Sequence, residues 1–331
     1  MHELQFLILT VIVLALLFDF INGFHDTANA IATSVSTRAI KPAHAIIMAA
    51  VLNFLGAIYS TGVAKTIGGD IVASAEMVDE HIIIAALMGS IVWNLFTWYV
   101  AMPSSSSHAL VGGIIGAVLV STGSTGLNFI GIGKIVLSLI ASPLLAIFSG
   151  FIVMTVLFLL FGRFAPSALN GRFKKMQILS AATMAFSHGS NDAQKSMGII
   201  TLALLSGGYL SSFEVPDYVK FLCAAAMACG TALGGWRIIR TIGGKIFKLE
   251  PISGFAADLN SSIVIFSATL LHLPVSTTHV VSGSIMGVGT AKRIRAVRWG
   301  VAQQMLVAWV LTIPCTAVMG ALAYQIVLWI F

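Results

Sequence analysis

Pro103-Ser104-Ser105-Ser106-Ser107-His108 is the stretch of this sequence that decides its fold, because a close copy, Pro274-Val275-Ser276-Thr277-Thr278-His279, follows 171 residues later. We call these two stretches the first tip (103–108) and the second tip (274–279). In both, three consecutive hydroxyl side chains precede a histidine and interrupt an otherwise apolar segment. A backbone broken at membrane depth is tolerated only where it lines a cavity or is buried in protein. Each tip is therefore a candidate binding site at the turn of a hairpin.

The composition around the tips is that of an integral membrane protein. Of 331 residues, 58% are hydrophobic and only 9% are charged, whereas a soluble domain is about one-quarter charged. Apolar runs such as 4–18 and 144–161 approach the roughly 20 residues that cross a bilayer as a helix. The predicted fold class is an all-α integral membrane protein, with the lipid bilayer as its surroundings. The net charge of +6 has a topological explanation, so we expect no nucleic-acid partner.

Landmarks of the first half return in the same order in the second half. Phe20 to Asp26 returns as Phe186 to Asp192, at an offset of 166 residues, and Pro143 returns as Pro314, at the 171-residue offset of the tips. We therefore predict two homologous repeats, 1–161 and 176–331, joined by a cytoplasmic linker, 162–175.

Each repeat is expected to hold three membrane-crossing helices and one re-entrant helical hairpin. The first crossing helix, about 4–36, is expected to break near Gly23. The hairpin arms are 81–102 and 108–120, and at about 1.5 Å per residue the second arm covers about 20 Å, which is short of a crossing. An odd number of crossings per repeat makes the two repeats inverted relative to one another.

Loop charge supports this topology. Under it, 14 of the 18 basic residues fall in cytoplasmic loops: Arg38, Lys41, Arg163, Arg172, Lys174, Lys175, Arg237, Arg240, Lys245, Lys248, Lys292, Arg293, Arg295 and Arg298. Basic residues concentrate in cytoplasmic loops of membrane proteins. We expect a multi-pass protein of the plasma (inner) membrane with both termini extracytoplasmic.

The two tips together are predicted to bind an oxyanion. The return arm of each hairpin begins at its tip, so a helix N-terminus points at the centre of the molecule, where free N–H groups and a partial positive charge favour an anion. The alternative is that the hydroxyls only cap the helix that follows. The predicted ligands are Ser105, Ser106, Ser107, Ser276, Thr277 and Thr278, with Asn29, Gln194 and Lys195 from the duplicated segments.

The duplicated aspartates Asp26 and Asp192 are predicted to bind a coupling cation. Ionisable residues deep in a membrane helix are costly and mark ion or substrate paths, and a carboxylate would repel an anion but attract Na⁺ or H⁺. Filling the cation sites would then turn repulsion of the anion into attraction. The alternative for Asp192 is an ion pair with Lys195, three residues on. The other predicted cation ligands are Asn22, Asn191 and Asp258, while Asn29 and Gln194 could also assist the cation.

Four histidines accompany these groups. His25 is a candidate proton carrier, and His108 and His279 are candidate anion donors. His188 opens the second duplicated segment and belongs to the same set of possible relays. For all four, the alternative is a neutral interior histidine that is simply hydrogen-bonded.

These residues resemble the inorganic phosphate transporter (PiT) family, whose two signature repeats appear here as 23–30 and 188–195. The resemblance implies cation-coupled uptake of inorganic phosphate on inverted repeats, with the paired aspartates in the coupling site and no cofactor. The identification of the anion as phosphate comes from this resemblance, since the residue pattern alone indicates only an oxyanion. His25 stands where many members have Asn, as in a bacterial branch similar to low-affinity, proton-coupled carriers of divalent-metal phosphate. The coupling ion, Na⁺ or H⁺, stays open.

Other functions remain as alternatives. A sulfate permease on the same scaffold is the nearest, and an anion channel with the hairpins as its filter is the next. An intramembrane hydrolase is disfavoured because the hydroxyls are duplicated symmetrically, whereas catalysis needs one differentiated nucleophile and base. We therefore expect no enzyme, and a homo-oligomer is possible.

Overall fold

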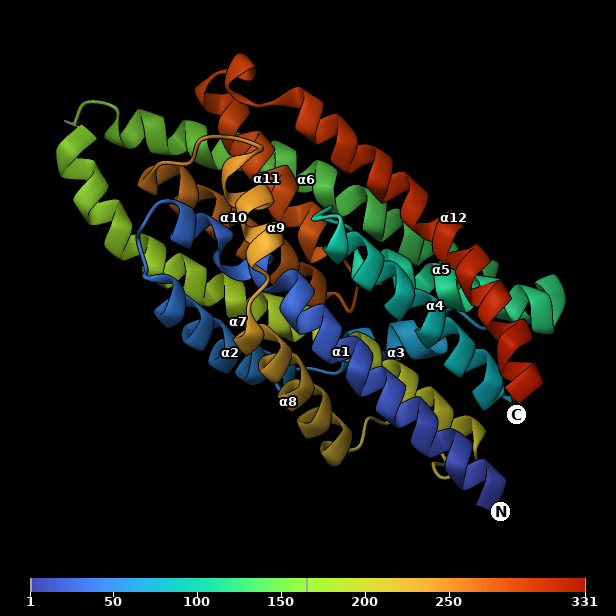
Figure 1. Ribbon diagram of the computed structural model, residues 1–331. Helices are drawn as coiled ribbons and strands as arrows, with labels where there is room; N and C mark the ends of the chain where they lie inside the picture. The colour runs from blue at the N-terminus through green and yellow to red at the C-terminus, as the bar shows by residue number, and fades with distance from the viewer. Residues whose placement is uncertain (1, 165, 331) are drawn as a thin grey trace.

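The computed structural model describes residues 2–164 and 166–330, and these are helical almost throughout (Figure 1). The first half forms α1 (His2–Ser36), α2 (Pro42–Ala57), α3 (Gly62–Gly69), α4 (Glu80–Tyr99), α5 (Ser106–Ser121) and α6 (Phe129–Phe161). The second half forms α7 (Pro166–Ser206), α8 (Asp217–Leu233), α9 (Trp236–Gly244), α10 (Pro251–Leu270), α11 (Thr277–Lys292) and α12 (Trp299–Ile330). Short 3₁₀ turns, η1 (Ala75–Met77), η2 (Gly123–Gly126) and η3 (Ile294–Ala296), precede α4, α6 and α12. The all-α prediction is confirmed.

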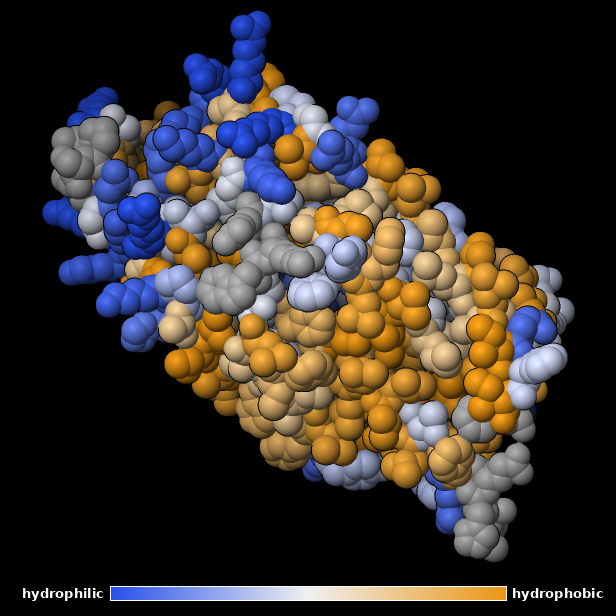
Figure 2. Space-filling model, viewed as in Figure 1, coloured by the Kyte–Doolittle hydropathy of each residue, from blue (hydrophilic) through white to orange (hydrophobic). Residues whose placement is uncertain are grey.

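Several helices are long and apolar enough to cross a membrane. Among the described residues there are four of them, α1 (from Leu4), α4, α6 and α12, or five if α2 and α3 form one bent span. Figure 2 shows an apolar belt across the face in view, with a strongly hydrophilic end on one side of it. The chain is a multi-pass membrane protein.

The two chain ends lie at the same end of the molecule (Figure 1). The α1–α2, α6–α7, α9–α10 and α11–α12 links lie at the opposite end, where Figure 2 shows the hydrophilic surface. These links carry basic residues such as Arg38, Arg163, Lys245 and Arg293. The basic links are thus separated from the termini along the length of the helices.

Two helical hairpins, α4–α5 and α10–α11, carry the tips. At the base of the first hairpin, the backbone N–H of Ala73 donates to the Gly126 carbonyl (2.9 Å). At the base of the second, the N–H of Arg298 donates to the Ile246 carbonyl (2.9 Å). The segments that flank each hairpin are therefore joined, and both tips lie in the middle of the molecule (Figure 1).

The two halves are interlocked rather than side by side. Helix α1 of the first half packs along α8 of the second, and α7 of the second half packs along α2 of the first. Likewise α5 packs along α12 and α11 along α6. The α5–α12 contact is so close that a Cβ on Gly116 would lie 1.9 Å from the carbonyl oxygen of Ala317. These helices of one half are therefore buried against helices of the other half.

The predicted break near Gly23 is wrong, because α1 runs without interruption from His2 to Ser36. The glycine serves close packing instead, since a Cβ there would lie 2.3 Å from the carbonyl oxygen of Met227 in α8. Gly189 does the same in α7, where a Cβ would lie 2.2 Å from the carbonyl oxygen of Asn53 in α2.

The breaks occur in the second segment of each half. Helices α2 and α3 are bent by 71° across residues 58–61. In the other half, α8 ends before Gly234, whose φ of 72° lies in the left-handed region that glycine adopts without strain. Each half thus has an interrupted second segment rather than a broken first helix.

Most of the linker 162–175 is helical rather than a loop. Helix α7 begins at Pro166, so Arg172, Lys174 and Lys175 lie in its first turns, and residue 165 lies outside the described residues. Proline at the first position of a helix costs no hydrogen bond, which explains where α7 begins.

Candidate functional site

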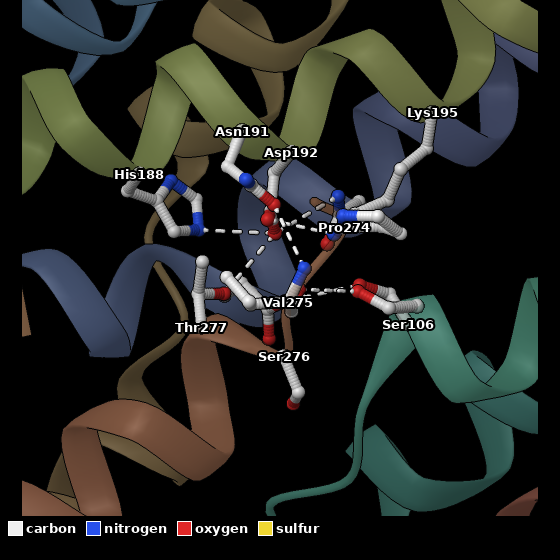
Figure 3. A network of polar contacts seen from close by, with 12 residues as sticks. Ser106, His188, Asn191, Asp192, Lys195, Pro274, Val275, Ser276 and Thr277 are labelled. Atoms are coloured by element: carbon white, nitrogen blue, oxygen red, sulfur yellow. Dashed lines mark hydrogen bonds and ion pairs between the residues drawn. The ribbon is translucent and has the colours of Figure 1, made fainter. Parts of the chain in front are cut away.

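The candidate site lies where the two tips meet the middle of α1 and α7. Asp26 comes from α1 and Asp192 from α7, and each is at most 1% exposed. Figure 3 shows Thr277 of α11 and Ser106 of α5 directed from opposite sides toward the space below Asp192, with His188 on the same side as Thr277. Carboxylates and hydroxyls are thus brought together in the interior, out of reach of solvent.

Asp26 is surrounded by hydrogen-bond donors from both halves. Its Oδ1 lies 2.7 Å from Nδ1 of His25 and accepts a hydrogen bond from the Thr278 hydroxyl (3.2 Å). Its Oδ2 accepts one from the Ser106 hydroxyl (3.2 Å). Both tips therefore contact this carboxylate.

Asp192 has the equivalent place in α7. The Lys195 ammonium donates to its Oδ1 at 2.6 Å. Its Oδ2 accepts hydrogen bonds from the Thr277 hydroxyl (3.1 Å) and the Asn22 amide (3.5 Å), and lies 3.5 Å from Nε2 of His188. The ion pair expected as the alternative for Asp192 is therefore present, together with a contact to the second tip.

The two aspartates and His188 form a group that could hold a cation. One ligand atom from each of Asp26, His188 and Asp192 lies within 4.8 Å of the others, and all three residues are buried. The side-chain oxygens of Asn22 and Asn29 are also buried, with no hydrogen-bond partner among the described residues. Carboxylate and amide oxygens suit hard cations, so these residues fit the predicted coupling ion.

The tips touch one another as well as the acids. The Ser107 hydroxyl donates to the Val275 carbonyl at 2.9 Å, and the Asn29 amide donates to the hydroxyls of Thr277 (3.3 Å) and Thr278 (2.9 Å). Residues of the first half thereby contact the second tip directly.

Capping accounts for only one hydroxyl in each tip. Ser105 accepts from the backbone N–H of His108 (3.2 Å) and Ser276 from that of His279 (3.3 Å). In Figure 3, Ser276 is turned away from Asp192. The hydroxyls of Ser106, Thr277 and Thr278 instead reach the aspartates.

Two residues predicted as ligands are engaged with backbone. Gln194 accepts from the backbone N–H groups of Val63 (2.7 Å) and Ala64 (3.2 Å) at the start of α3. Asn191 donates to the Leu273 carbonyl (3.2 Å) and accepts from the N–H of Val275 (3.3 Å). Gln194 therefore holds α3 against α7, and Asn191 holds the second tip.

Asp258 and two of the histidines lie apart from the aspartate group. Asp258 is buried on α10 and accepts from the Thr33 hydroxyl (2.5 Å). His108 and His279 face one another, with ring centroids 4.5 Å apart, and His279 stacks on Trp309 at 4.0 Å. Together these three rings line a cavity of about 660 Å³ between α6 and α12.

Asp19 is a buried acid that the sequence patterns missed. It is fully buried in α1, its Oδ1 accepts from the Ser196 hydroxyl of α7 (2.7 Å), and its Oδ2 has no hydrogen-bond partner among the described residues. A carboxylate inside the first apolar segment was the feature of the sequence that could have identified this site. Asp19 has no equivalent in the second half, because Ala185 occupies the matching position.

Comparison with known proteins gives one consistent result. The model of the phosphate transporter family matches residues 22–172 and 163–320. A probable low-affinity inorganic phosphate transporter of Bacillus subtilis is 51% identical over the whole of both chains. A protein of the same description from Rhizobium meliloti is 46% identical over 96% of both chains.

A solved structure is similar over almost the whole fold. It is described as the sodium-dependent phosphate transporter, it matches with a TM-score of 0.91 and 26% identity, and the match covers 98% of this chain and 100% of the other. These relatives are transporters rather than enzymes.

Proposed function

This chain belongs to the phosphate transporter family, and on that premise we propose that it carries inorganic phosphate across the plasma membrane together with a coupling cation, Na⁺ or H⁺. The observation that carries the proposal is the contact between the Asp26–His188–Asp192 group and the hydroxyls of both tips. A cation site and an anion site in direct contact can load together. Loading of phosphate alone would add negative charge to a buried site that already holds two carboxylates and one ammonium group, which is costly in a membrane interior.

The cation is assigned to the carboxylates. Asp26 and Asp192 come from the two halves and bring two negative charges into a fully buried site. A cation bound among their oxygens removes the repulsion that phosphate would otherwise meet. Coupling follows from this electrostatic linkage, because each ion raises the affinity of the site for the other by the same factor.

Phosphate is assigned to the tips. Helices α5 and α11 begin at Ser106 and Thr277. Because Ser105 and Ser276 cap the N–H groups of His108 and His279, the N–H groups of the first two residues of each helix are left for an anion. The neighbouring hydroxyls can rotate from the carboxylates toward phosphate oxygens. Two helix N-termini from different halves suit a tetrahedral anion with several acceptor oxygens. The relatives' descriptions support phosphate as this anion.

The topology that goes with this function is one of inverted repeats, 1–161 and 176–331, with re-entrant hairpins that enter from opposite faces. Basic links at one end of the molecule and both termini at the other support extracytoplasmic termini by the positive-inside rule. Inverted repeats with helix ends meeting at the midplane are the usual architecture of secondary transporters.

Transport into liposomes tests the proposal. The purified protein is reconstituted, and uptake of labelled phosphate is followed under an imposed Na⁺ gradient and, separately, an imposed H⁺ gradient, with and without Mg²⁺. We expect accumulation above equilibrium with one of the gradients, abolished by the matching ionophore and little affected by excess sulfate. Uptake that only equalises phosphate and ignores both gradients would mean a channel, and equal competition by sulfate would mean a general oxyanion permease.

A further inference from the structure

The duplicated segments differ at one position that changes the charge of the site. The 166-residue offset that maps Asp26 onto Asp192 also maps Asn29 onto Lys195. Both residues stand three positions after their aspartate on a continuous helix, and this spacing places side chains on the same face. The first half thus has a neutral amide where the second half has an ammonium group.

The two positions have different partners. Lys195 is fully buried and its Nζ lies 2.6 Å from Oδ1 of Asp192. Asn29 uses its amide N–H groups on the second tip, while its side-chain oxygen is buried with no hydrogen-bond partner among the described residues. The Asp26 side therefore offers an unsatisfied acceptor to a cation, whereas the Asp192 side already has a cation, supplied by the chain.

The charge balance of the site follows from these contacts. Asp26 and Asp192 bring two negative charges, and Lys195 brings one positive charge. Removing one partner from a buried ion pair strands the other charge in a medium of low dielectric constant, so Lys195 stays with Asp192 while the site is closed. A site with amides at both positions would need one more cation from solution.

We propose that Lys195 is a tethered cation that replaces one coupling ion, so that this protein couples one fewer free cation to each phosphate than a site with Asn at both positions. The inference rests on the proposed function, because it specifies the cation requirement of the same site. It also gives Lys195 a different role from that of a phosphate ligand. Asp26, His188 and the Oδ2 of Asp192, the oxygen that is not the one bound by Lys195, are left for the single exchangeable ion.

The ratio of cations to phosphate tests this inference. The ratio is obtained in proteoliposomes whose membrane potential is held at zero with K⁺ and valinomycin, from the cation gradient at which net phosphate flux vanishes against a fixed phosphate gradient. This zero-flux point reports stoichiometry independently of rate and of the charge carried. In Lys195→Asn we expect the ratio to rise by one relative to the wild type. An unchanged ratio combined with a large rise in the phosphate concentration for half-maximal uptake would overturn the inference, because Lys195 would then act on phosphate.

An exposed pair of the same spacing provides the control. Lys220 contacts Asp217 at 2.8 Å, also three positions apart, and Asp217 is 85% exposed. Lys220→Asn is expected to keep the wild-type ratio, because water compensates Asp217.

A double variant covers the case in which Lys195→Asn does not fold. Asp192→Asn combined with Lys195→Asn removes a pair that is internally neutral, and replacing both partners of a buried pair by neutral groups is often tolerated. The rate of uptake is expected to fall in this variant, because Asp192 also belongs to the cation-binding group, but the inference requires the wild-type ratio of cations to phosphate. A ratio lower by one would show that Asp192 takes a free cation, and would overturn it. Absence of gradient-driven uptake in the wild type would instead refute the proposed function, and the unfolding temperature would then test the role of Lys195. An unfolding temperature that depends more strongly on Na⁺ or pH in Lys195→Asn than in the wild type supports the tethered cation. The same dependence as in the wild type contradicts it.

Discussion

The hydroxyl of Ser107 in the first tip donates a hydrogen bond to the backbone carbonyl of Val275 in the second tip, at 2.9 Å. The contact joins hairpins from different halves of the chain directly beside the two buried aspartates. Because both tips are almost completely buried, the site can open to either side of the membrane only if the hairpins move relative to the helices that enclose them.

If only one of the two hairpins moves in each opening step, the contact between Ser107 and Val275 must break, and holding the tips together should stop transport. A Ser107→Cys and Val275→Cys pair, in a chain whose Cys223, Cys229 and Cys315 are replaced by alanine, is treated with a short bifunctional thiol reagent. Phosphate uptake should fall to background and return when a cleavable reagent is reduced. Each single cysteine variant is the control, and a cross-linked protein that still transports would exclude separation of the tips as a required step.

Asp26→Asn should abolish the cation dependence of uptake. The amide is nearly isosteric but has no charge, so the exchangeable ion loses its main ligand, and gradient-driven uptake should fall by at least about tenfold, the effect of about 1.4 kcal/mol. The measurement is initial uptake against cation concentration. Asp217→Asn, at a side chain that is 85% exposed, is the matched control and should behave as wild type; a normal cation response in Asp26→Asn would refute the assignment.

Asp192→Asn should destabilise the protein more than Asp26→Asn does. It leaves the fully buried ammonium of Lys195 without its partner at 2.6 Å, and breaking a buried pair in this way costs about 3–5 kcal/mol. The unfolding temperature in detergent is the measurement. Equal unfolding temperatures for the two variants would contradict the tight pairing of Asp192 and Lys195.

Ser106→Ala and Thr277→Ala should weaken phosphate binding to a similar degree. The two hydroxyls occupy equivalent places on α5 and α11, and each contacts the aspartate of its own half. Loss of a hydrogen bond to a charged group costs about 1.5–3 kcal/mol, so the phosphate concentration for half-maximal uptake should rise by more than about tenfold. Ser149→Ala removes a hydroxyl that donates to the carbonyl of Leu145, one turn earlier in α6, and should leave this value unchanged.

Gly116→Ala should unfold the protein more readily, whereas Gly133→Ala should not. A Cβ on Gly116 would lie 1.9 Å from the Ala317 carbonyl oxygen, so α5 and α12 would have to separate, while a Cβ on Gly133 would meet nothing within 4 Å. Overpacking of this kind costs about 1–3 kcal/mol, and glycine to alanine at an open helical position gains up to about 1 kcal/mol. Thermal unfolding of both variants in the same detergent gives the comparison.

Duplication made the central residues predictable from the sequence. The tips and the aspartates each occur twice at a regular offset, which singled them out among many apolar helices, and the structure brings Asp26 and Asp192 into one group with His188. Asp19 lacks a second copy and was missed for that reason, although it is equally buried.

The partners of these residues could not be predicted, because they come from helices distant in the chain. Gly23 was expected to break α1, but its role depends on the approach of α8, about 200 residues later. Gln194 was expected to bind an ion, but the start of α3 uses its oxygen. A pattern within one segment identifies unusual residues, whereas their function as packing sites or ligands depends on which helix lies opposite.

The crossed packing of α1 on α8 and of α7 on α2 has a consequence for biogenesis. When the ribosome has completed only the first half, α1 and α2 are in the bilayer without the neighbours that cover Asn22, Asp26 and Asn53. These polar groups stay without their native partners until the second half has been synthesised and inserted. During that time, lipid headgroups or insertion factors have to solvate them.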